Sequence, residues 1–333
     1  MGVSVVDMAT GATAGVNDSA WFPMMSVYKL PIAIHALRMA EQGRLDLATS
    51  VTLSTEDRRS GFSPLARTIE EKGPQVLSVK ELLSSLMRIS DNTASDKLLR
   101  LAGGPHAIEG TRSLNVAGIS VDRYELEFAA DYYGVCCAQR ETPFSLDRFA
   151  AAAEKVPVAR RRRAAAAFLR DRRDSAQPKG MATLLARLVR GALLNATNTA
   201  WLIGEMSEMH TRDTRLRAGL PAGTFAALRP GTSGETEGIR AAHNDNAIVK
   251  LPDGRYLVIA AFMKGARGTE AQRDATLASV ACAAYEWIYS AGGRKSPRRT
   301  KTQSTDPAAI VSTLPMVKRR RCAAISGGVK RSI

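Results

Sequence analysis

The chain has 333 residues, 45% of them hydrophobic, so it can bury the core of one large domain or two ordinary ones. Its apolar runs are too short for a transmembrane helix, and no signal peptide is visible because Met1 leads directly into a strand-like segment. The net charge of +15 is concentrated at one end, since residues 292–333 hold 11 lysines and arginines against one aspartate. The basicity is therefore a property of the tail and not of the fold.

Neither the cysteines nor the histidines have the spacing of metal ligands. Two cysteines are adjacent, and the others, like the histidines, are scattered singly: Cys136, Cys137, Cys282, Cys322, His35, His106, His210 and His243. We therefore expect no metal ion and no cofactor.

The N-terminal part predicts two short strands, at residues 2–8 and about 12–16, followed by a helix with apolar residues at helical spacing from Leu30 onward. Ser26 lies at the start of this helix, and Lys29 follows one turn later on the same face. A lysine there can take the proton of the serine hydroxyl, and the positive helix end assists it, so Ser26 is a candidate nucleophile. This is the only Ser-x-x-Lys in the chain, although a serine N-cap with a lysine in the first turn gives the same pattern.

A second polar motif, Ser90-Asp91-Asn92, falls between two helices. Residues 78–89 predict a helix that opens on a Ser-x-x-Glu capping box, and another helix begins at Thr93. Three polar residues at such a place can simply be helix caps. The presence of Ser-x-x-Lys in the same chain favours a catalytic role for them, because the two motifs together are typical of penicillin-recognising serine enzymes.

The chain then continues with helices and ends with strands. Arg123 and Glu125 lie in a loop, where an arginine close to a glutamate can also be a surface ion pair of little energetic value. Residues 144–172 predict an Ala- and Arg-rich helical stretch with a solvated face at 160–163. Further helices are predicted at about 180–194, 198–210 and 270–290, and strands at 224–234, 244–251 and 256–263.

Together these motifs resemble those of class A serine β-lactamases, within the larger family of penicillin-recognising serine hydrolases. The likeness covers about residues 2–290 and rests on motif order and spacing. The motifs are Ser26-x-x-Lys29, Ser90-Asp91-Asn92, Arg123-x-Glu125, and Arg229-Pro230-Gly231 at the position of the family's Lys-Thr-Gly.

The resemblance implies an α+β fold of the β-lactamase/transpeptidase type. A five-stranded antiparallel sheet with flanking helices, built from residues 1–24 and 214–291, would pack beside an all-helical domain at 25–213 that carries the catalytic motifs. Residues 292–333 would form a disordered basic tail.

The resemblance also implies four catalytic residues: Ser26, Lys29, Ser90 and Glu125. Ser26 would attack the lactam carbonyl and become acylated. Lys29 would help to remove its proton, although Glu125 acting through a water is the disputed alternative. Ser90 would pass a proton to the departing nitrogen, and Glu125 would activate the water that releases the acyl group.

Substrate contacts follow from the same resemblance. The oxyanion hole would be the backbone N–H groups of Ser26 and Thr232, which act where charge develops. The candidate binding residues are Asn92 for the side-chain amide, Arg229 for the carboxylate, Gly231 and Thr232 beside it, Phe62 at the cleft mouth and Arg215 as a second cation.

Three departures from the family pattern bear on function. Ala129 stands where the family has an asparagine that helps to seat the deacylation water. Pro230 replaces a threonine whose hydroxyl binds the substrate carboxylate, and Arg229 is longer and planar where the family has lysine. No counterpart of the family's N-terminal helix is visible, so an apolar stripe of the terminal helix is expected to lie partly uncovered and to permit association of an otherwise monomeric chain. The stripe includes Leu277, Val280, Ala281, Ala284 and Ile288.

The sequence thus predicts a serine β-lactamase that hydrolyses the β-lactam amide through an acyl-enzyme on Ser26, with Arg229-Pro230 and Ala129 as candidate impairments. One alternative is a penicillin-binding pseudoenzyme that acylates without efficient turnover. Another is a binder of nucleic acid or a similar anionic polymer through the basic tail. The family works in the periplasm or outside the cell, whereas the chain as written shows no export signal and would stay in the cytoplasm.

Overall fold

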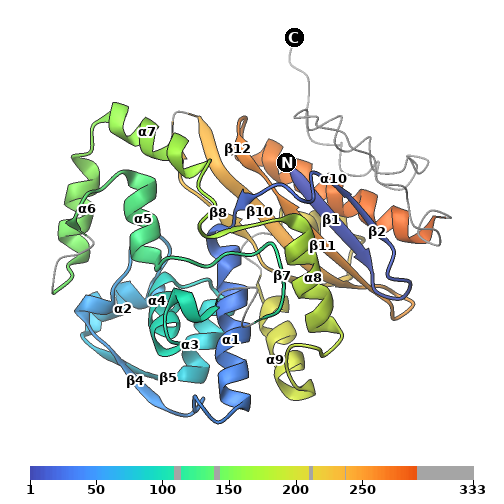
Figure 1. The fold of residues 1–333 in the computed structure, drawn as a ribbon, viewed down its shortest axis with the longest axis horizontal. Coiled ribbons are helices and arrows are strands. Elements are labelled where there is room, and N and C mark those ends of the chain that lie inside the picture. The colour runs from blue at the N-terminus through green and yellow to red at the C-terminus, as the bar shows by residue number, and fades with distance from the viewer. Residues whose placement is uncertain (109–113, 139–142, 210–212, 237, 291–333) are drawn as a thin grey trace.

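A computed structural model describes residues 1–290 apart from 109–113, 139–142, 210–212 and 237 (Figure 1). The predicted basic tail, with Cys322, lies outside these described residues, as does His210. The strands are β1 (Gly2–Asp7), β2 (Thr13–Val16), β3 (Phe22–Pro23), β4 (Ser50–Leu53), β5 (Gln75–Ser78), β6 (Ser175–Ala176), β7 (Phe225–Leu228), β8 (Gly231–Thr232), β9 (Glu235–Thr236), β10 (Ile239–Lys250), β11 (Tyr256–Phe262) and β12 (Lys264–Ala266).

The α-helices are α1 (Lys29–Glu41), α2 (Pro64–Lys72), α3 (Val79–Arg88), α4 (Asn92–Leu101), α5 (Glu125–Tyr133), α6 (Leu146–Glu154), α7 (Val158–Phe168), α8 (Pro178–Val189), α9 (Ala196–Ser207) and α10 (Glu270–Tyr289). Short 3₁₀ turns are η1 (Met25–Tyr28), η2 (Thr55–Asp57), η3 (Pro105–Ile108) and η5 (Leu216–Gly219). The α+β class predicted from the sequence is confirmed.

The main sheet joins the two ends of the described chain. Its strands follow the order β12-β10-β11-β1-β2, and every pairing is antiparallel. β7, β8 and β9 all pair with β10 and are pieces of one broken edge strand. β12 continues β11 along the other side of β10, so the sheet is five strand positions wide, as the resemblance implied.

Alternate residues of the central strands face opposite layers, as the two-residue repeat of a strand requires. Ala247 and Val249 of β10 belong to a cluster under α10, whereas Ile248 between them belongs to the larger core shared with α1 and α8. The predicted division into two domains stays a prediction, and α8, which lies inside the segment assigned to the helical domain, packs against β1 and β11.

The apolar stripe of α10 is not uncovered, so that expectation is wrong. Its residues are at most 3% exposed and pack against β1, β10 and β11: Leu277, Val280, Ala281, Ala284 and Ile288. The stripe faces the sheet itself, and it therefore offers no apolar surface for association.

α1 is the central helix of the helical layer. Ten of its 13 residues are buried, so it is apolar nearly all round, as expected for a core helix. α3 and α4 pack against it, and the predicted capping box at the start of α3 is confirmed. There Ser78 Oγ accepts from the Glu81 N–H at 3.2 Å, and the Glu81 carboxylate accepts from the Ser78 N–H at 2.7 Å.

Between Arg123 and Asp174 the chain makes an excursion through α5, α6 and α7, at the upper left of Figure 1. The stretch predicted at 144–172 forms two helices, because Pro157 lacks an N–H and serves as the N-cap of α7. The four arginines at 160–163 are exposed, as predicted. The excursion has an apolar cluster of its own, which makes it a packed unit: Leu126, Ala130, Val135, Ala138, Phe144, Phe149 and Val156.

Candidate active site

Ser26 lies in η1, directly before α1, and is half-buried. The residue before it, Met25, has φ of +49°, a left-handed conformation that costs energy for a side chain of this kind. Asn244 of β10 anchors the approach, since its Nδ2 donates to the carbonyls of Pro23 and Met24 at 2.8 and 3.1 Å. The candidate nucleophile is thus held by the sheet on one side and by the core helix on the other.

Lys29 is fully buried, and its ammonium group is the centre of the site. Nζ lies 3.4 Å from Ser26 Oγ, 3.3 Å from Ser90 Oγ and 2.7 Å from the Ser90 carbonyl. It also lies 2.5 Å from Asn92 Oδ1 and 3.1 Å from Glu125 Oε1. Four of the predicted polar residues therefore meet at one amine.

Glu125 is the first residue of α5 and is buried against Lys29. Its backbone N–H donates to Asp96 Oδ1 at 2.6 Å, which fixes the start of the helix. Burial raises the pKa of the Glu125 carboxyl, while the Lys29 ammonium works against that rise. Burial likewise lowers the pKa of Lys29, opposed by the Glu125 carboxylate. The two pKa values therefore move toward each other.

Arg229 follows β7 and points inward, with no exposed surface. Its Nε donates to the Ser26 carbonyl at 2.8 Å and its Nη2 to Ser90 Oγ at 2.9 Å. Its Nη1 donates to the carbonyls of Leu86 and Met87, both at 3.1 Å. Burial lowers the pKa of this guanidinium to about 9. The sequence placed a cation here but gave no sign that it would bridge η1, the end of α3 and Ser90.

β8 brings Gly231 and Thr232 beside the nucleophile. A Cβ at Gly231 would lie 2.3 Å from the Met24 carbonyl oxygen, so only glycine permits this approach of the edge strand to η1. Thr232 Oγ1 accepts from Arg215 Nη2 at 2.7 Å. Arg215 is fully buried and is held by Asp274 at 3.2 Å and the Asn244 carbonyl at 2.8 Å. The structure therefore joins Arg215, named from the sequence, to the predicted binding strand.

The remaining predicted binding residues are Asn92, the first residue of α4, and Phe62, in the loop before α2. Asn92 Nδ2 donates to the Ser60 carbonyl at 2.7 Å, and the Asn92 N–H donates to the Phe62 carbonyl at 3.1 Å. Phe62 itself is 58% exposed. Ser90 has φ of +62°, a left-handed conformation that is uncommon for a residue other than glycine.

The two departures from the family pattern have different surroundings. Pro230 is buried in the break between β7 and β8, opposite Asp245 of β10, on an edge strand where proline is tolerated. Ala129 packs against the apolar cluster of the excursion. Neither side chain offers a polar group.

Arg123 is not a surface residue, so the surface-pair interpretation is wrong. It is 3% exposed, and its Nε donates to Asp174 Oδ2 at 2.6 Å while Nη1 donates to Asp131 Oδ2 at 2.6 Å. Its guanidinium also lies over the rings of Phe128 and Phe168. This cluster closes the base of the excursion beside Glu125, and no local pattern could pair residues 51 positions apart.

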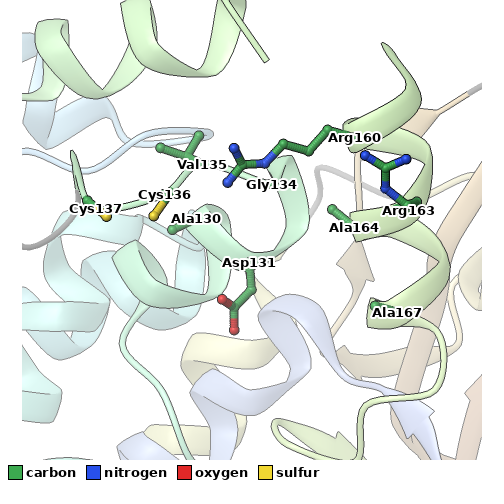
Figure 2. A pocket seen from close by; sticks show the side chains of 10 residues that line it. All are labelled: Ala130, Asp131, Gly134, Val135, Cys136, Cys137, Arg160, Arg163, Ala164 and Ala167. Atoms are coloured by element: carbon green, nitrogen blue, oxygen red, sulfur yellow. The ribbon is translucent and has the colours of Figure 1, made fainter. Parts of the chain in front are cut away.

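A hollow of about 500 Å³ lies between α5 and α7 (Figure 2). Arg160 and Arg163 project from α7 on one side, and Cys136 and Cys137 lie on the other. None of the predicted site residues lines it. Asp131, one of its lining residues, accepts from Arg123 Nη1 at 2.6 Å.

Within the described residues, no three His, Cys, Asp or Glu side chains lie close enough to hold a metal ion. Over the same part of the chain, no helix combines the length and apolar character needed to cross a membrane.

A model of the β-lactamase enzyme family matches residues 1–288. The chain belongs to this family. The extended-spectrum β-lactamase PER-1 of Pseudomonas aeruginosa is 30% identical over 274 residues, which cover 82% of this chain and 77% of that protein. The β-lactamase VEB-1 of the same organism is 25% identical over 295 residues, covering 87% and 85%.

Solved structures agree with this membership. A β-lactamase from Chitinophaga pinensis superposes with a TM-score of 0.68 at 26% identity, over 84% of this chain and 90% of that one. An ancestral class A β-lactamase superposes with a TM-score of 0.66 at 28% identity, over 84% and 91%. The likeness to class A β-lactamases inferred from the motifs is therefore confirmed.

Proposed function

We propose that this chain is a serine β-lactamase that opens the lactam amide through an acyl-enzyme on Ser26. The position of Lys29 Nζ is the observation that carries the proposal, since it lies within 3.4 Å of Ser26 Oγ, Ser90 Oγ and Glu125 Oε1. One amine thus reaches the nucleophile, a second hydroxyl and a carboxylate. Such an arrangement suits a reaction in which a serine loses its proton on acylation and regains one on deacylation.

In the acylation step, Lys29 takes the proton of Ser26 as Oγ attacks the lactam carbonyl. Burial lowers the pKa of Lys29, which makes the neutral amine accessible. Lys29 and Arg229 both donate to Ser90 Oγ, so the hydrogen of that hydroxyl is left to point at the departing nitrogen. The lactam C–N bond breaks as the nitrogen receives this proton, and Lys29 passes the proton that it took from Ser26 to Ser90 Oγ.

In the deacylation step, Glu125 takes a proton from the water that attacks the ester on Ser26. A general base works best when its pKa lies near the working pH, and burial moves the pKa of Glu125 upward in that direction. The oxyanion formed in both steps would accept from the backbone N–H groups of Ser26 and Thr232.

The substrate carboxylate is assigned to Thr232 with Arg215 behind it. Arg215 donates to Thr232 Oγ1, which leaves the hydrogen of that hydroxyl for a ligand. Arg229 uses its three nitrogens on protein acceptors. We therefore assign it no hydrogen bond to the substrate carboxylate, and it would act on that carboxylate through its positive charge. Asn92 and Phe62 would contact the substrate's side chain from the opposite rim.

Incubation with a chromogenic cephalosporin, followed by a mass spectrum of the intact protein, tests this function. Colour development with no lasting adduct supports hydrolysis. A stable adduct without turnover would instead support the penicillin-binding pseudoenzyme, which Ala129 and Pro230 favour because neither supplies a polar group. Absence of both adduct and turnover would exclude both functions.

Pro230→Thr is expected to raise kcat/KM about tenfold or more. Residues 230 and 232 lie on the same face of the strand, so a threonine would place a second hydroxyl beside Thr232. A hydrogen bond to a charged group contributes roughly 1.5–3 kcal/mol, or about 10- to 150-fold in rate. Pro252→Thr, an exposed proline in the turn between β10 and β11, is the matched control and should leave kcat/KM unchanged. No gain in Pro230→Thr would exclude Pro230 as a brake on turnover.

Arg229→Lys is expected to destabilise the protein by about 2 kcal/mol, although it restores the family residue. A single ammonium cannot reach the carbonyls of Ser26, Leu86 and Met87 together, and a buried acceptor left without a donor costs about 1–3 kcal/mol. Urea unfolding at pH 7 measures this loss. An unchanged midpoint would mean that these carbonyls find other donors.

A further inference from the structure

We propose that the hollow between α5 and α7 is a site of thiol modification, in which Cys136 forms a mixed disulfide with a small disulfide that carries carboxylates. Oxidised glutathione is a molecule of this class. Arg160 and Arg163 would bind its carboxylates while the thiol reacts. None of the predicted catalytic or binding residues lines the hollow, so the site is separate from the proposed function.

The hollow has the size and the groups that such a ligand needs. Its volume is about 500 Å³, and sites for small molecules measure roughly 300–1,000 Å³. α7 forms one wall with Arg160 and Arg163, which lie one turn apart on the same face of the helix. The segment after α5 forms the other wall with Cys136 and Cys137, whose thiols are exposed (Figure 2). Thiols and cations thus share one opening.

The two arginines are available to a ligand. Among the residues that the structure describes, neither Arg160 nor Arg163 forms an ion pair or a hydrogen bond through its guanidinium. Both lie in the first half of α7, which has no acidic residue in its first turn. The N-terminal end of a helix stabilises anions and disfavours cations. A bound carboxylate would therefore offset the repulsion within the run of four arginines at 160–163.

Asp131 does not cancel this positive charge, although it also lines the hollow. Its carboxylate accepts from Arg123 Nη1 at 2.6 Å and from Arg173 Nη2 at 3.0 Å. Figure 2 shows the carboxylate turned away from Arg160. Since neither of its two partners lines the hollow, the charge left for a ligand is positive, which favours an anionic disulfide over a neutral one.

Arg160 favours Cys136 over Cys137 as the reacting residue. The stem of Arg160 packs on the turn that ends α5, because a Cβ at Gly134 would lie 3.5 Å from Arg160 Cγ. Figure 2 shows the guanidinium reaching past Gly134 on the side of Val135 and Cys136. A neighbouring cation favours the thiolate, which is the nucleophile in disulfide exchange. The reaction is therefore assigned to Cys136.

The exchange is balanced without a further oxidant. Cys136 loses its proton, and its thiolate attacks one sulfur of the small disulfide. A new S–S bond forms to Cys136 as the S–S bond of the ligand breaks. The departing thiolate takes up a proton, so one mixed disulfide and one small thiol result.

Glutathione disulfide is the probe for the reacting residue. It is incubated with the full chain carrying Cys137→Ser, so that no neighbouring thiol can displace the adduct, and the product is located by mass spectrometry with peptide mapping. One glutathione on Cys136 is expected. Cys136→Ser is the matched control, and it should form no adduct on Cys137 over the same time. An adduct on Cys137 in that control, or none on Cys136 in Cys137→Ser, would overturn the inference.

Arg160→Gln with Arg163→Gln, made in the Cys137→Ser chain, tests the carboxylate contacts. Adduct formation is timed with glutathione disulfide and with hydroxyethyl disulfide, which is neutral. The ratio of the two rates removes any effect on the reactivity of the thiol itself. This ratio should fall about fivefold, the change expected when two exposed ion pairs of typical strength are lost.

Arg161→Gln with Arg162→Gln is the matched control, because it removes the same charge from the same run of arginines and neither residue lines the hollow. Its ratio should equal that of the chain with all four arginines. An unchanged ratio in the Arg160 and Arg163 variant, or an equal fall in the control, would overturn the role of the two arginines. No β-lactam enters these measurements, so a chain without β-lactamase activity would defeat the proposed function and leave this site decided by the rates.

Discussion

Replacing Ser26 with alanine is expected to abolish both turnover and the covalent adduct. Removing the nucleophile from a set of catalytic residues that act together lowers kcat by a factor on the order of 10⁶. The remaining catalytic residues then have no serine hydroxyl to activate. The fold should be retained, because the Ser26 hydroxyl serves Lys29 as one distant acceptor at 3.4 Å, and Lys29 keeps Ser90 and Asn92 as closer ones. Mass spectrometry of penicillin-treated protein, with peptide mapping, measures the adduct.

Ser279→Ala is the matched control for this result. The Ser279 hydroxyl donates to the Ala275 carbonyl within α10, on the far side of the sheet from Ser26. This variant should form the adduct at the unchanged rate. An adduct that persists in Ser26→Ala, on any other serine, would contradict the assignment of the nucleophile.

Features that depend on residues close together in the chain could be predicted from the sequence. A helical repeat places Lys29 one turn after Ser26, and the structure brings the two side chains together. Ser78 and Glu81 form the predicted capping box for the same reason. The edge strand predicted at 224–234 is broken at Pro230, a break that the missing N–H of proline could have indicated.

Features that depend on distant pairing could not be predicted. Arg123 looked like a surface residue because its partner, Asp174, lies beyond three helices of the excursion. The stripe on α10 was recognised as apolar, but periodicity does not say which surface covers it, and the sheet does.

Glu125→Gln is expected to separate the two chemical steps. A glutamine cannot take a proton from the attacking water, so deacylation should slow by roughly 10²–10⁴-fold, the usual contribution of a general base. Acylation should continue, because loss of the carboxylate removes the interaction that raises the pKa of Lys29 and leaves more of its amine neutral. A long-lived adduct on Ser26 should therefore accumulate, and its decay after removal of excess antibiotic gives the deacylation rate.

Glu127→Gln is the matched control, since Glu127 is exposed on the same first turn of α5 and accepts from the Tyr124 N–H as part of a capping box. Glutamine can fill that capping role, so this variant should turn over at the unchanged rate. Normal deacylation in Glu125→Gln would mean that another group activates the water. Loss of acylation as well as deacylation would mean that Glu125 also serves as the base for Ser26, and Lys29 would then act through its charge alone.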